Sequence, residues 1–157
     1  MFHSSLPLAL GGNADVLAFS KHLDGMVYVT ADLTGKPEES ETNYELMIVH
    51  RTRLDWGPRI LSQSAPYAIE NPIHAEQSMD IGSATPETSA IKGFVFATYG
   101  TFRLFEQDCE LRLCLGITED ELAFKHEHGA ERLLTLLKRN GVYPYTDFER
   151  TSVPLDA

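Results

Sequence analysis

The residues best suited to chemistry in this chain are the consecutive His126, Glu127 and His128. A metal site would need two of these side chains to converge on one ion. Residues two apart on a helix point about 200° apart, so the two histidines cannot bind one metal together. The residue four after His126 is Ala130, and the HExxH zinc motif is therefore absent. We interpret both histidines as surface residues near a helix end and predict no metal site.

Three consecutive carboxylates, Glu119, Asp120 and Glu121, have the composition of an acid–base cluster. They fall in the first turn of a predicted helix. Negative charge is favourable there by ~0.3–1 kcal/mol per residue, because it lies at the positive end of the helix dipole. We therefore predict a structural role for all three.

The two cysteines are poor candidates for a nucleophile, which needs a nearby base and a positive setting. Cys109 lies between Asp108 and Glu110, whose charges would raise the thiol pKa, and Cys114 is flanked by leucines. Five residues apart on one predicted strand, the two side chains point to opposite faces, which disfavours a disulfide. We predict two reduced thiols, as is typical of a reducing compartment.

Longer catalytic motifs are also missing: the sequence has no G-x-S-x-G elbow, no P-loop and no G-x-G-x-x-G. We predict a protein that is not an enzyme and holds no cofactor. A second hypothesis is a small hydrolase or transferase that pairs one of His74, His126 or His128 with a carboxylate. A third is a structural subunit that forms homo-oligomers through an apolar patch.

The charge balance restricts the partners. The chain has 157 residues and a formal net charge of −10, which disfavours binding to a nucleic-acid backbone or to an anionic membrane surface. A basic protein would suit it as a partner. The N-terminal residues lack the basic region of a signal peptide, and no run approaches the ~18 apolar residues of a membrane span. We therefore expect a cytoplasmic protein.

Alternation and apolar runs predict the strands, and turn residues separate them. Residues 15–20 and 26–31 are expected to form a hairpin around Asp24-Gly25. The other predicted strands are residues 44–50, 79–82, 93–99 and 109–115. In the last of these, three leucines at 111, 113 and 115 should face the core, while Glu110, Arg112 and Cys114 point away.

Two regions predict helices. Pro58 suits the first turn of one helix, with Trp56 packing it onto the sheet, but Pro66 should either kink that helix or end it near Ser64. Residues 117–141 predict two short helices. Thr118 and Glu121 can form a capping box at the beginning, and Asn140-Gly141 can end the second helix. Ala130, Leu133, Leu134 and Leu137 form the predicted apolar stripe of this second helix.

These elements indicate an α+β fold: a mixed, mainly antiparallel β-sheet flanked by helices, with a C-terminal two-helix segment. The length predicts one domain over residues 1–157.

The order of segments resembles the suppressor of fused family in its compact bacterial form. The matching segments are DVLAFS, YVTADLTGKP, YELMIV, the Trp56-Gly57-Pro58 entry to a helix, GFVFATYGTF, residues 109–141 and YTDFERTSV. The resemblance covers residues from about Ala14 to Val153. It departs at residues 30–34, where the family pattern T-x-G-hydrophobic-S is replaced by TADLT.

The resemblance implies a non-enzymatic protein-binding module. For the bacterial members it implies an immunity protein that binds and neutralises a polymorphic toxin. An acidic surface facing a basic toxin would speed their association. We predict that Glu38, Glu39, Glu41 and Glu45, in and beside the polar segment 34–43, form this surface. The alternative is a solvated loop.

Overall fold

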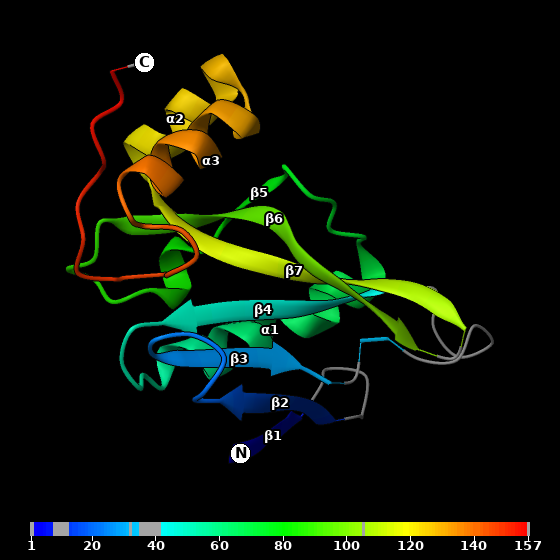
Figure 1. Cartoon of the computed structure of the whole chain (residues 1–157). Helices are drawn as coiled ribbons and strands as arrows, with labels where there is room; N and C mark the ends of the chain where they lie inside the picture. Colours follow the sequence, from blue (N-terminus) through cyan, green and yellow to red (C-terminus); the bar gives the residue numbers. More distant parts are fainter. Residues whose placement is uncertain (1, 8–12, 32, 35–41, 105, 157) are drawn as a thin grey trace. The chain divides into compact units, whose positions relative to one another are not determined.

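The computed structural model describes residues 2–7, 13–31, 33–34, 42–104 and 106–156 (Figure 1). They fall into two compact units. The first unit combines the chain up to Ile73 with Thr98–Leu113, and the second combines His74–Ala97 with the chain from Cys114 onward. Each unit is described below by itself. The prediction of one domain over residues 1–157 stays a prediction.

The predicted α+β class is confirmed. Within the residues that the structure describes, seven strands are hydrogen-bonded in the order β1-β2-β3-β4-β7-β6-β5. Their bounds are β1 Phe2–Pro7, β2 Asn13–Phe19, β3 Met26–Thr30, β4 Tyr44–His50, β5 Ser78–Asp80, β6 Ile91–Leu104 and β7 Gln107–Thr118. The neighbours β1–β2, β2–β3, β3–β4 and β5–β6 pair in antiparallel fashion, whereas β4 and β7 are parallel. The sheet is therefore mixed and mainly antiparallel.

The first unit contains the predicted hairpin and the predicted central strand. β2 and β3 pair in register, with Val16 opposite Thr30 and Phe19 opposite Val27. All seven residues of β4 are buried. This burial fits a nearly continuous apolar run that is covered on both faces. Helix α1 (Trp56–Glu70) packs against β4, β3 and β2.

Helix α1 continues through Pro66, so of the two alternatives predicted for Pro66, an end near Ser64 is wrong. Its end is instead decided by Pro72, which has no N–H to donate to the Ala68 carbonyl oxygen. The Tyr44 hydroxyl donates to that oxygen over 3.0 Å and accepts from the Ile73 N–H over 2.9 Å. A side chain from β4 thus completes the hydrogen bonding at the end of α1.

The second unit contains the helix pair α2 (Glu119–His128) and α3 (Ala130–Arg139), a short 3-10 helix, η1 (Gly82–Ala84), and β5. The capping box of Thr118 and Glu121 is confirmed, and Gly141 has the positive φ of +70° expected of a helix stop. The prediction of the apolar stripe of α3 is partly wrong. Leu136 is buried, although it was not predicted to belong to the stripe, whereas Leu134 is only half-buried.

The predicted alternation along β7 is also wrong in part. Leu113 and Leu115 are buried as expected, but Leu111 is only half-buried. Arg112 and Cys114, expected to point to solvent, are 7% and 1% exposed. Both faces of this strand are covered, so its polar residues are buried as well.

The two thiols are buried and are not joined by a disulfide, as predicted. Within the described ranges, no helix has the length and apolar character needed to cross a membrane.

Candidate partner-binding site

Most of the predicted acidic surface lies outside the described residues. Glu38, Glu39 and Glu41 belong to the range 35–41, about which the structure says nothing. Their assignment as partner contacts stays a prediction. The fourth member, Glu45, is described, and its surroundings differ from those of an exposed acidic contact.

Glu45 is a buried residue of β4, with only 5% of its surface exposed. Its carboxylate accepts hydrogen bonds from the Thr30 hydroxyl, the Leu33 N–H at 3.3 Å, and the Thr34 N–H and hydroxyl at 2.9 and 2.7 Å. We therefore correct its expected role: Glu45 does not belong to an exposed surface, because its oxygens bind the chain just before residue 35. It holds residues 33 and 34 in place.

The buried position also affects the protonation of Glu45. Burial raises the pKa of this carboxyl group, although the hydrogen bonds from Thr30, Thr34 and Leu33 oppose the change. The folded protein therefore binds a proton at Glu45 more readily than the unfolded chain does. Its contribution to stability is full below the unfolded pKa of about 4.3 and is lost as the pH rises through the folded pKa.

We expect Glu45→Gln to gain stability relative to the wild type as the pH rises from about 4 to 8. The amide is neutral throughout, whereas the wild-type carboxylate must carry a buried charge at the higher pH. Urea unfolding of both proteins across this pH range measures the effect. Glu87→Gln, at an exposed position, controls for the change in net charge. If both variants follow the same pH dependence, the assignment to Glu45 is wrong.

Arg112 is another buried charge of the first unit, and it is paired with a carboxylate. Its guanidinium lies 2.6 Å from the Glu110 carboxylate, donates to the Thr98 hydroxyl over 3.3 Å and lies 5.2 Å from the centre of the Tyr44 ring. The alternating sequence CELRLCL indicated an exposed arginine, so sequence reasoning missed this cluster. The contacts explain Arg112 as part of the packing around β4 and β7.

The residues considered for chemistry do not assemble into a pocket. His74, His126 and His128 are exposed, and His128 lies 3.7 Å from Glu127, which is exposed as well. Burial raises the pKa of the Cys109 thiol, with further contributions from Glu45 and Asp108. The raised pKa and the contribution of Asp108 were predicted, whereas that of Glu45 was not. In the part of the chain that the structure describes, no group of three His, Cys, Asp or Glu residues could hold a metal ion.

Glu121 binds residues of the C-terminal segment in addition to capping its own helix. It is fully buried, and its oxygens accept from the Arg150 guanidinium at 2.6 and 2.7 Å, from the Val153 N–H at 2.9 Å and from the Thr118 N–H at 3.0 Å. Arg150 also donates to the Gly116 carbonyl oxygen over 2.8 Å. This ion pair binds the C-terminal segment to α2 and to the end of β7. Glu119 and Asp120, in the same helical turn, are exposed.

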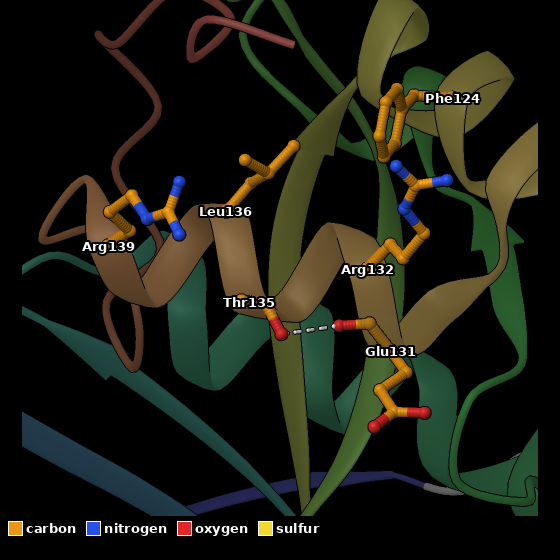
Figure 2. Close-up of a pocket in the computed structure, with 6 residues that line it drawn as sticks. All are labelled: Phe124, Glu131, Arg132, Thr135, Leu136 and Arg139. Carbon is orange, nitrogen blue, oxygen red and sulfur yellow. Dashed lines mark hydrogen bonds between the residues drawn. The ribbon is translucent and has the colours of Figure 1, made fainter. Parts of the chain in front are cut away.

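A groove lies on the helix pair of the second unit, which sequence reasoning did not identify. Its volume is about 420 Å³. Figure 2 shows the residues that line it: Phe124 of α2, and Glu131, Arg132, Thr135, Leu136 and Arg139 of α3.

The family is established by comparison. The model for "Suppressor of fused protein (SUFU)" matches residues 14–151. This chain therefore belongs to the suppressor of fused family, as the resemblance indicated. Among curated proteins, no match is found.

Three solved structures share the fold. A SUFU homologue from Neisseria gonorrhoeae FA 1090 is 21% identical, with a TM-score of 0.72 and with 99% of this chain and 90% of that chain covered. Drosophila Suppressor of Fused is 12% identical, with a TM-score of 0.71; 90% of this chain matches 42% of that one. A chain of the Sufu–Fu complex is 12% identical, with a TM-score of 0.72 and with 97% and 84% covered.

Proposed function

We propose that this protein is a non-enzymatic, cytoplasmic protein-binding module and that its partner is a basic toxin, which it neutralises as an immunity protein. The observation that carries the proposal is the family match over residues 14–151. A relative of the same fold was crystallised as the Sufu–Fu complex, which supports protein binding as the function of this fold.

The charge of the chain supports a basic partner. Asp and Glu together number 23, against 13 for Lys and Arg. Complementary charge accelerates encounter and orients the partners, while apolar contacts hold the complex. The acidic segment with Glu38, Glu39 and Glu41 begins directly after residues 33 and 34, which Glu45 holds by hydrogen bonds.

We expect the triple variant Glu38→Gln, Glu39→Gln, Glu41→Gln to bind the toxin about tenfold more slowly at low salt, with the difference shrinking as salt is added. The toxin is sought among the products of adjacent genes by pull-down, and protection is scored by co-expression. Association rates are then measured by surface plasmon resonance. The control variant Glu70→Gln, Glu87→Gln, Glu149→Gln removes the same charge from exposed positions elsewhere.

The outcomes separate the parts of the proposal. Equal association rates for the two triple variants would show that Glu38, Glu39 and Glu41 are not part of the binding surface. If no neighbouring gene product binds or is neutralised, the immunity function is contradicted.

A further inference from the structure

We propose that the groove on α2 and α3 binds a segment of a partner protein. This segment carries an apolar side chain that is flanked by two carboxylates. The apolar side chain would contact Phe124 and Leu136, and the carboxylates would pair with Arg132 and Arg139. The acidic surface proposed above selects a basic toxin, whereas this groove selects an acidic segment. The two proposals rest on different residues.

The apolar part of the groove comes from one residue of each helix. Phe124 and Leu136 are 7% and 6% exposed, so both are fixed in the core while still lining the groove. Arg132, Thr135, Leu136 and Arg139 follow the i, i+3, i+4, i+7 spacing of a single helix face. In Figure 2, Leu136 lies between the two guanidinium groups, and the side chain of Arg132 extends toward the Phe124 ring.

The two arginines are available for a ligand. Both side chains are exposed, and neither guanidinium forms a hydrogen bond or an ion pair with any residue that the structure describes. The carboxylate of Glu131 points away from Phe124 and Leu136 (Figure 2). In a chain with a net charge of −10, this groove therefore presents positive charge beside an apolar floor.

Helix stability does not explain both arginines. Arg139 lies in the last turn of α3, where positive charge is favourable. Arg132 lies in the first turn of the same helix, where the dipole disfavours positive charge. A planar guanidinium is well suited to bind a carboxylate through two parallel hydrogen bonds, so a carboxylate ligand accounts for Arg132.

The spacing defines the partner segment. Seven residues of helix separate Arg132 and Arg139 by about 10.5 Å along the axis of α3. A partner helix lying along this groove would fit it if the helix carried acidic residues at positions i and i+7 and an apolar residue at i+3 or i+4. The proposed occupant is therefore an amphipathic helix whose apolar face is flanked by acidic residues.

The test uses a fluorescein-labelled synthetic peptide with Glu at positions i and i+7 and Leu at i+3 and i+4, in a helix-forming background. Fluorescence polarisation at low ionic strength measures its affinity for the full chain. We expect binding that weakens with salt, and a dissociation constant that is raised about tenfold or more in Arg132→Gln/Arg139→Gln. The control Lys21→Gln/Arg103→Gln removes the same charge at exposed positions outside the groove and should bind as the wild type does.

Two further peptides complete the test. One carries Lys in place of both Glu residues and should not bind, and the other carries Ser in place of both Leu residues and should bind more weakly. Because both arginines are exposed, circular dichroism should show an unchanged fold in their double variant. The proposal is overturned if the acidic peptide does not bind at about 1 mM, if the groove variant binds it as well as the control variant, or if the Lys peptide binds equally.

Discussion

Glu121→Ala is expected to lower the free energy of unfolding by about 3–5 kcal/mol. The substitution leaves the Arg150 guanidinium, whose side chain is only 10% exposed, without its carboxylate, since Glu121 accepts two of its hydrogen bonds. It also removes the acceptor of the buried Thr118 and Val153 N–H groups. An uncompensated buried charge and orphaned donors act together here. Urea unfolding followed by circular dichroism measures the loss.

A neighbouring carboxylate provides the control for Glu121. Glu119→Ala, in the same helical turn but exposed, should cost less than about 1 kcal/mol. The double variant Glu121→Ala/Arg150→Ala should lose less stability than the two single losses added together, because it leaves no unpaired charge. If Glu121→Ala proves as mild as Glu119→Ala, the ion pair does not hold the C-terminal segment as we infer.

Gly25→Ala should destabilise the chain by roughly 2–6 kcal/mol, because strain and steric overlap each contribute about 1–3 kcal/mol. Gly25 closes the hairpin between β2 and β3 with a φ of +115°, which side-chain-bearing residues rarely adopt. A Cβ at this position would lie 2.2 Å from the His50 carbonyl oxygen and 2.8 Å from the Arg51 Cα. Both obstacles are backbone atoms, so a change of rotamer cannot relieve the overlap. Thermal and urea unfolding measure the loss.

Two other glycines separate strain from overlap. Gly141 has a φ of +70° with open space around its Cβ position, so Gly141→Ala should show the strain alone, about 1–2 kcal/mol. Gly100 has open space and no positive φ, so Gly100→Ala should be nearly neutral. Equal losses at Gly25 and Gly141 would show that the contact with β4 contributes nothing.

The candidate site was only partly accessible to sequence reasoning. The spacing of residues 117–141 predicted both C-terminal helices, but the groove depends on Phe124 of one helix lying beside Leu136 of the other. The signal that was missed is Arg132, a positive charge in the first turn of a helix, where the dipole gives it no stabilising role. Glu38, Glu39 and Glu41 remain the sequence-based prediction for the partner surface.

Features that depend on neighbouring residues were determined by the sequence alone. The capping box joins residues three apart, Gly141 ends a helix through its own backbone, and the hairpin follows from two apolar runs around Asp24-Gly25. In each case the interacting groups are brought together by the local chain conformation. Hydrogen bonding and steric preference over a few residues are therefore sufficient to predict them.

The roles of Glu45, Glu121 and Arg112 were decided by the tertiary structure alone. Glu45 was predicted to belong to an acidic partner surface and Glu121 to stabilise the first turn of a helix. Both are buried, because most of the groups that donate to their carboxylates belong to residues 11 to 32 positions away. Arg112 is buried on β7 because both faces of that strand are covered, which alternation within the strand cannot reveal. A charged side chain can leave water only where distant segments supply its hydrogen bonds, and the position of those segments is a property of the whole fold.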